Sequence, residues 1–132
     1  MAKKKLGTKR YHKNTSRFSS FMNSFYGIKY AFIEETNFIP MFIISFIVLF
    51  MSFYFQITRG EFIIIIICIF SVFIVELINT SIEVLVDLVS PEENPLAKIS
   101  KDIAGGATLC ASFMSLIIGL IIFLPKIMEV IK

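Results

Sequence analysis

The sequence predicts an all-α integral membrane protein with one amphipathic surface helix near the N-terminus and three transmembrane helices. The 132 residues are 56% hydrophobic and only 17% charged, and their mean hydropathy is +0.80. Soluble domains are about 45–50% apolar and about 25% charged, so this composition excludes an ordinary soluble fold as well as a disordered chain. Three long apolar runs then follow a strongly basic N-terminal segment.

The basic charge is concentrated at the N-terminal end. Residues 1–30 contain eight basic residues and no acidic residue, and the rest of the chain contains five basic and ten acidic residues. A basic segment ahead of apolar spans favours the cytoplasmic side and contact with anionic lipid. A nucleic-acid-binding function is the alternative, but no folded basic surface with interleaved aromatic residues follows. We therefore expect membrane lipids as partners and no nucleic acid.

Two regions are expected: a flexible basic tail at 1–15, because it is polar and rich in lysine, and one membrane domain at 16–132. Residues 16–34 predict the surface helix. Their apolar side chains recur at helical spacing, and most of their small polar residues fall on the other side of the helix. The apolar residues are Phe18, Phe21, Met22, Phe25, Ile28 and Phe32.

The three spans are expected at about 38–55, 62–89 and 96–124. Asn37 and Pro40 indicate the start of the first span, and residues 56–61 form a polar turn. Residues 90–95 break the second span, and Asn94 with Pro95 begins the third helix, which we expect to end at Pro125. With a basic N-terminus, this topology places the N-terminus and the 90–100 loop in the cytoplasm, and the 56–61 turn and the C-terminus on the outer side. We therefore expect a multi-pass protein of the bacterial plasma membrane.

One face of the second span is polar, although charged residues within a membrane helix are costly and usually functional. Glu76, Asn79, Glu83 and Asp87 are spaced so that they lie within roughly 80° of one another around the helix. Counted from Phe62, Glu76 lies roughly 21 Å into a hydrocarbon core about 30 Å thick. Glu83 should lie near the headgroups and Asp87 in water.

This pattern suits phosphate chemistry at a membrane surface. A carboxylate held away from water readily accepts a proton, as a general base must. Mg²⁺ takes one or two protein carboxylates together with nucleotide phosphates, and Glu83 and Glu35 are expected at the same height. Lys101 could neutralise phosphate charge there. The residues alone also allow a polar helix interface in an oligomer, or the lining of an ion path.

The segment from Glu76 to Asp87 has the pattern ExxNTxIExxVD, and Lys101-Asp102-Ile-Ala follows it. At these residues the sequence resembles the prokaryotic diacylglycerol kinases, a family of small trimeric membrane kinases. The resemblance covers residues from about Arg17 to Lys126. The stretch from Asn94 to Asp102 is most similar to the undecaprenol kinase branch of Gram-positive bacteria.

The resemblance implies transfer of the γ-phosphate of ATP to a lipid alcohol, with Mg²⁺ as cofactor, in a homotrimer whose active sites lie between subunits. It implies undecaprenol as the substrate, with diacylglycerol as the alternative. Glu76 would be the general base and Asn79 would position the cluster. Glu35 and Glu83 would hold the metal. The residues at the nucleotide would be Glu35, Glu83, Asp87, Lys101 and Asp102.

The family often has an arginine directly after the metal-binding glutamate of the first span, and a histidine soon afterwards. Here Glu35 is followed by Thr36 and Asn37, so those basic residues are absent. Two non-catalytic alternatives therefore stay open, namely an inactive relative that acts as a structural partner and a transporter-like subunit. A transporter would be expected to spread its acidic residues across the membrane, whereas these cluster at one end.

Overall fold

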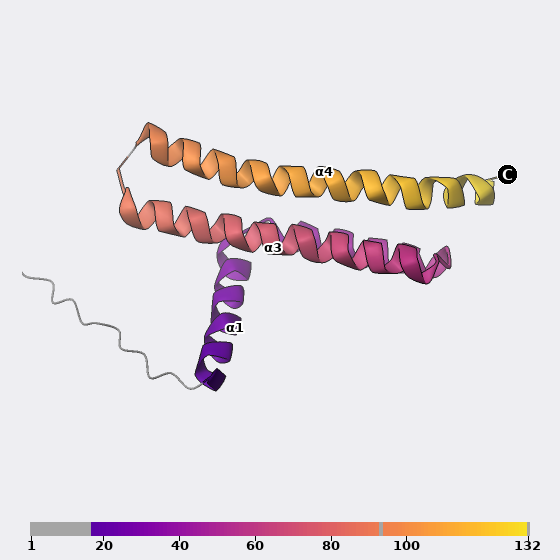
Figure 1. The fold of residues 1–132 in the computed structure, drawn as a ribbon, viewed down its shortest axis with the longest axis horizontal. Coiled ribbons are helices and arrows are strands. Elements are labelled where there is room, and N and C mark those ends of the chain that lie inside the picture. Colours follow the sequence, from indigo (N-terminus) through magenta and orange to yellow (C-terminus); the bar gives the residue numbers. More distant parts are fainter. Residues whose placement is uncertain (1–16, 93, 132) are drawn as a thin grey trace, which may run out of the picture.

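The computed structural model describes residues 17–92 and 94–131, and these residues form four α-helices and no strand. The helices are α1 (Arg17–Glu34), α2 (Phe38–Tyr54), α3 (Arg59–Val89) and α4 (Pro95–Ile131). α3 and α4 run antiparallel along one another, α2 packs on α3, and α1 projects sideways from this bundle (Figure 1). The predicted tail at 1–15 lies outside the described residues.

The helices differ in their capacity to cross a membrane. α3 and α4 are each long and apolar enough to do so alone, whereas α1 and α2 meet the same test only as a pair. The two members of that pair are bent by 100° at the break between them. The predicted division into a helix along the membrane surface and a helix that enters the membrane requires such a bend, and it stays a prediction. α2 spans 17 residues, or about 25 Å of rise, close to the hydrocarbon thickness.

The second predicted span begins earlier than the sequence analysis places it. Residues 59–61 were expected in a polar turn, but they form the first turn of α3. Thr58 caps this helix: its hydroxyl accepts from the Glu61 backbone N–H at 3.3 Å, and the Glu61 carboxylate accepts from the Thr58 backbone N–H at 2.7 Å. This capping box satisfies two backbone donors that otherwise lack partners, so the helix extends to include the polar residues.

The third predicted span is longer than expected, because α4 continues through Pro125 to Ile131. A proline removes one backbone hydrogen bond and commonly ends or bends a helix. Contacts beyond it hold the last turns in place. Lys126 lies 3.9 Å from the Glu61 carboxylate, and Ile127 packs against the buried cluster of Ile122 and Phe123. The predicted end at Pro125 is therefore wrong.

Phe38 anchors the corner between α1 and α2. Its side chain is fully buried, with 0% exposure. Its ring lies 4.4 Å from the ring of Phe32 on α1 and 6.1 Å from the ring of Phe73 on α3, measured between centroids. One aromatic cluster thus joins three helices, and it lies about one turn from Glu76 along α3.

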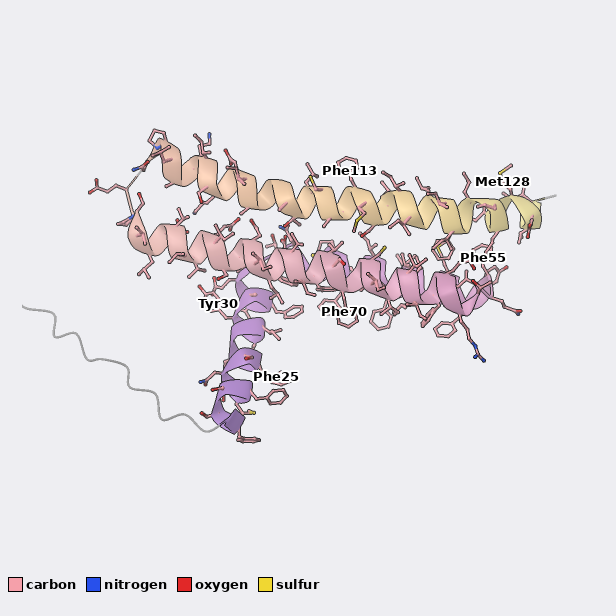
Figure 2. The ribbon with its side chains drawn as sticks, viewed as in Figure 1. Phe25, Tyr30, Phe55, Phe70, Phe113 and Met128 are labelled. Carbon is pink, nitrogen blue, oxygen red and sulfur yellow. The ribbon has the colours of Figure 1, made fainter. Side chains whose placement is uncertain are left out.

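Most other large apolar side chains face outward. Phe25, Phe70 and Phe113 point away from the neighbouring helices (Figure 2) and are more than half exposed. A soluble protein rarely exposes so continuous an apolar surface. Lipid, or a second copy of the chain, provides the apolar surroundings that such side chains require.

We predict that Phe38→Ala lowers the free energy of unfolding by about 3–5 kcal/mol, as expected for truncating a fully buried phenylalanine. The measurement is unfolding by a denaturing detergent, followed by circular dichroism in micelles. Phe46→Ala is the matched control, because Phe46 is also on α2 but is exposed. Equal losses in the two variants would show that the corner does not depend on Phe38.

Candidate active site

The polar residues of α3 become more exposed toward the α3–α4 loop. Glu76 is 1% exposed, and Asn79 and Thr80 are also buried. Glu83 is half-buried and Asp87 is exposed. The depths of the three carboxylates in the membrane stay a prediction. The α3 face therefore presents one carboxylate held within the protein and two closer to water.

The buried carboxylate of Glu76 has a specific partner. The Asn37 side-chain amide donates to Glu76 Oε1 at 2.9 Å. A carboxylate in a low-dielectric interior is costly unless it is hydrogen-bonded. The Thr80 hydroxyl donates to the Glu76 backbone carbonyl, at 3.0 Å. It therefore makes no hydrogen bond to the Glu76 carboxylate, whose partner is Asn37.

Asn37 is a site residue that the sequence analysis did not identify. It was expected to start the first span, and α2 does begin directly after it. Its side chain makes no capping hydrogen bond, because its backbone is already helical, with φ −68° and ψ −23°. The amide is therefore free to reach α3. An asparagine directly before a membrane helix was the available signal.

Asn79 and Glu83 lie one helical turn apart on α3. The Asn79 side-chain amide donates to Glu83 Oε1 at 3.1 Å. This bond fixes one oxygen of Glu83 and leaves the other free. Asn79 therefore contacts Glu83, and its role in positioning the acidic cluster stays a prediction.

Glu35 lies in the turn between α1 and α2 and is half-buried. Burial raises the pKa of its carboxyl above the ordinary value, and the charges of Glu83, Glu76 and Glu34 raise it further, in that order. The structure thus brings Glu35, Glu76 and Glu83 into one negative region, although Glu35 is distant from the other two in sequence. Such a cluster favours a proton or a cation.

Lys101 and Asp87 form an ion pair of 2.5 Å across the α3–α4 hairpin. Asp87 is one turn beyond Glu83, so this pair lies on the loop side of the acidic cluster. Asp102 is exposed on α4 beside Lys101. Within residues 17–92 and 94–131, the structure shows no hydrogen bond or ion pair for Asp102, so it is not joined to the cluster.

The predicted metal site would use the carboxylates of Glu35 and Glu83. In the part of the chain that the structure describes, no group of three or more His, Cys, Asp or Glu side chains is arranged to hold a metal ion. Mg²⁺ needs only one or two protein carboxylates when nucleotide phosphates supply the other ligands. The free oxygens of Glu35 and Glu83 fit that requirement. The cysteines lie elsewhere: Cys68 is buried and Cys110 exposed, and both are free thiols.

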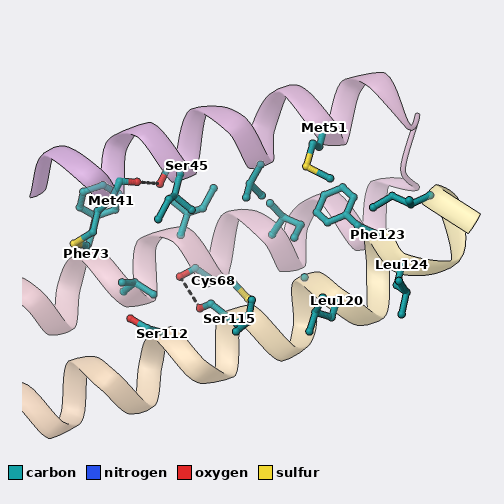
Figure 3. A pocket seen from close by; sticks show the side chains of 18 residues that line it. Met41, Ser45, Met51, Cys68, Phe73, Ser112, Ser115, Leu120, Phe123 and Leu124 are labelled. Atoms are coloured by element: carbon teal, nitrogen blue, oxygen red, sulfur yellow. Dashed lines mark hydrogen bonds between the residues drawn. The ribbon is translucent and has the colours of Figure 1, made fainter. Parts of the chain in front are cut away.

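An apolar groove of about 430 Å³ runs between α2 and α4, with α3 as its floor (Figure 3). Its end nearest the acidic cluster is formed by Met41 and Phe73, and its other end by Phe123 and Leu124. Phe73 lies about one turn from Glu76. The groove therefore has the polarity and the position for a hydrocarbon chain whose polar end reaches the carboxylates.

The geometry defines a small helical membrane protein with a carboxylate site at one end of its bundle. The sequence matches the prokaryotic diacylglycerol kinase family over residues 22–123. An undecaprenol kinase of Bacillus subtilis is 40% identical over 110 residues, which cover 83% of this chain and 89% of that protein. This chain belongs to the prokaryotic diacylglycerol kinase family and is a membrane-bound lipid kinase.

Two further relatives are named diacylglycerol kinase. The protein from Helicobacter pylori is 39% identical over 83 residues, which cover 63% of this chain and 65% of that protein. The protein from Synechocystis is 44% identical over 59 residues, which cover 44% of this chain and 34% of that protein. The family thus includes relatives named for two different lipid alcohols.

We predict that Glu83→Gln lowers the pKa of Glu35 toward its ordinary value, because the largest charge that raises it is removed. Glutamine keeps the shape of Glu83 and still accepts the Asn79 hydrogen bond. The measurement is a pH titration of the Glu35 side-chain carboxyl by ¹³C NMR. Glu34→Gln is the control and should give a smaller change, because Glu34 contributes least. An unchanged Glu35 titration in Glu83→Gln would contradict the clustering.

Proposed function

We propose that this protein transfers the γ-phosphate of ATP to a membrane lipid alcohol in a Mg²⁺-dependent reaction, and that the alcohol is undecaprenol. The observation that carries the proposal is the buried Glu76 carboxylate, held by Asn37 and next to Glu35 and Glu83. The choice of undecaprenol is supported by the identity with the Bacillus subtilis undecaprenol kinase along most of both chains.

Glu76 is the general base in this proposal. Asn37 occupies its Oε1 atom, so Oε2 is the oxygen that accepts the proton of the lipid hydroxyl. The resulting alkoxide character at the lipid oxygen permits attack on the γ-phosphorus, and ADP leaves. The hydrogen bond from Asn37 holds the carboxylate in one orientation during this step, which is what a positioned base requires.

Glu35 and Glu83 would hold Mg²⁺ at the phosphates. Glu83 Oε1 is fixed by Asn79, and the other oxygen of Glu83 and the carboxylate of Glu35 are available as ligands. When bound, the cation would neutralise negative charge on the transferring phosphate. Clustered carboxylates repel one another without it, in keeping with the raised pKa of Glu35.

Lys101, Asp87 and Asp102 would contact the nucleotide on the loop side of the cluster. Lys101 pairs with Asp87 in the structure, so ATP would draw the lysine onto a phosphate and release the aspartate. A lysine acts on phosphate as a point charge and tolerates this change of partner. The hydrocarbon chain of the lipid would lie in the apolar groove, with its hydroxyl near Glu76.

The subunits would assemble into a homotrimer with sites completed between neighbours. The family resemblance supports this proposal, and the outward-facing apolar side chains of α2, α3 and α4 supply surface for it. Native mass spectrometry from micelles should detect three copies of the chain. A fully active monomer would contradict the assembly.

We predict that the purified protein in micelles phosphorylates undecaprenol in the presence of ATP and Mg²⁺, and diacylglycerol more slowly. The measurement is transfer of ³²P from labelled ATP to each lipid, offered separately. Preference for diacylglycerol would overturn the choice of substrate and leave the lipid kinase in place. In sealed inverted membrane vesicles, external ATP should be used, because we place the N-terminus and the active site on the cytoplasmic side of the plasma membrane.

We predict that Glu76→Gln lowers kcat by at least about 10²-fold, the lower range for loss of a general base. Glutamine keeps the size of the side chain and its acceptor oxygen for Asn37, so folding and ATP binding should change little. Glu92→Gln is the matched control, because Glu92 is an exposed acid in the α3–α4 loop. Full activity in Glu76→Gln would rule out the base. No transfer by the wild-type protein would favour the inactive relative.

A further inference from the structure

Two buried polar atoms lie without a hydrogen-bond partner in the described residues. They are Asn79 Oδ1 on α3 and Thr108 Oγ1 on α4. Buried polar atoms in folded proteins are nearly always paired, because leaving one unpaired costs the full desolvation penalty. The two atoms complement each other, since an amide oxygen only accepts and a threonine hydroxyl can donate.

The register of the hairpin places these residues at the same height. Ser115 Oγ on α4 lies 3.5 Å from the Cys68 carbonyl oxygen on α3, and Lys101 pairs with Asp87. Thr108 lies midway between Ser115 and Lys101, about two helical turns from each. On α3, the position midway between the two contact residues, Cys68 and Asp87, is near residue 78, and it lies opposite Thr108. Asn79 is therefore opposite Thr108.

Both residues also lie on the faces that pack together. Asn79 is within about 20° of Cys68 around α3, and Thr108 is within about 20° of Ser115 around α4. Asn79 is only 6% exposed, and at this angle α4 is the helix that covers it. Along the facing stripe of α4, Thr108 is flanked by Ala104 and Ala111, which offer no side-chain donor.

The contact with Glu83 determines which way the Asn79 amide is turned. A carboxylate accepts hydrogen bonds, so the Nδ2 group must face Glu83, as it does at 3.1 Å. The Oδ1 atom is then turned away from Glu83 and needs a donor from the helix that covers Asn79.

We propose that Thr108 is a positioning residue whose hydroxyl is linked to Asn79 Oδ1 through one buried water, since the two atoms make no direct hydrogen bond. This link holds the amide so that Nδ2 stays on Glu83. Without it, the amide can rotate by half a turn and bring Oδ1 against the Glu83 carboxylate, which repels it. The catalytic part of this inference rests on the proposed role of Glu83 as a Mg²⁺ ligand.

The first test does not depend on activity. The variant is Thr108→Val, which removes the hydroxyl and keeps the branched shape. The readout is hydrogen exchange of the Asn79 side-chain amide by ¹⁵N NMR in micelles, with the signal assigned by its loss in Asn79→Ala. We expect exchange to be about three- to ten-fold faster in Thr108→Val, and to return to the wild-type rate in Thr108→Ser.

The second test measures the Mg²⁺ dependence of lipid phosphorylation in the same variants. We expect the half-saturating Mg²⁺ concentration to rise about three- to ten-fold in Thr108→Val, with the KM for lipid unchanged. Ser115→Ala is the matched control, because it removes a hydroxyl from the same face of α4, two turns farther from Glu83. Its half-saturating Mg²⁺ concentration should equal that of the wild type.

Several results would overturn the inference. One is an unchanged exchange rate of the Asn79 amide in Thr108→Val, and another is a Thr108→Ser variant as impaired as Thr108→Val. A Mg²⁺ shift of equal size in Ser115→Ala would indicate a general loosening of the helix interface. If Glu83→Gln leaves the Mg²⁺ requirement unchanged, the metal assignment fails instead, and the exchange measurement still decides the Thr108–Asn79 link.

Discussion

The site depends on one hydrogen bond, from the Asn37 amide to the buried carboxylate of Glu76. A carboxylate at 1% exposure requires a donor, and the helix that carries Glu76 supplies a donor only to its backbone. The donor comes from the turn between α1 and α2. Phe38, whose ring packs against those of Phe32 and Phe73, fixes the position of this turn. An apolar anchor and a polar contact on adjacent residues therefore hold the same corner.

This corner explains how a surface helix and a membrane helix can share one active site. The 100° bend between α1 and α2 brings Glu35 from the membrane surface into the charge of Glu76 and Glu83. A straight continuation of α1 into α2 would carry Glu35 around the helix and away from α3. Because Glu35 is in the turn itself, it reaches the cluster and is still partly exposed to solvent, as its proposed contact with a nucleotide requires.

The sequence was sufficient for the helices and for the acidic stripe, because both depend on periodicity within one segment. The start of α3 and the end of α4 were misplaced for a different reason. The Thr58 capping box and the contacts beyond Pro125 outweigh the preference of polar residues and proline for turns. The first of these could have been found from the T-x-x-E pattern at Thr58. The Asn37–Glu76 pair could not, since it joins residues on different helices and no local pattern specifies it.

The four helices contribute to the site in different ways, and this division follows from the cost of burying charge in a membrane. α3 carries the acids, and each acid that is wholly or partly withdrawn from water has an identified contact: Asn37 before α2 for Glu76 and Asn79 for Glu83. The exposed Asp87 forms an ion pair with Lys101 of α4. The turn after α1 adds Glu35, whose charged form is disfavoured by burial and by the charges of Glu83, Glu76 and Glu34, so its pKa is raised. In the proposed mechanism a bound cation offsets that cost, and the cost arises because the bend at Phe38 brings Glu35 near Glu76 and Glu83. If Glu35 holds the cation as proposed, folding of the corner and binding of the cation are coupled, because both depend on the same turn.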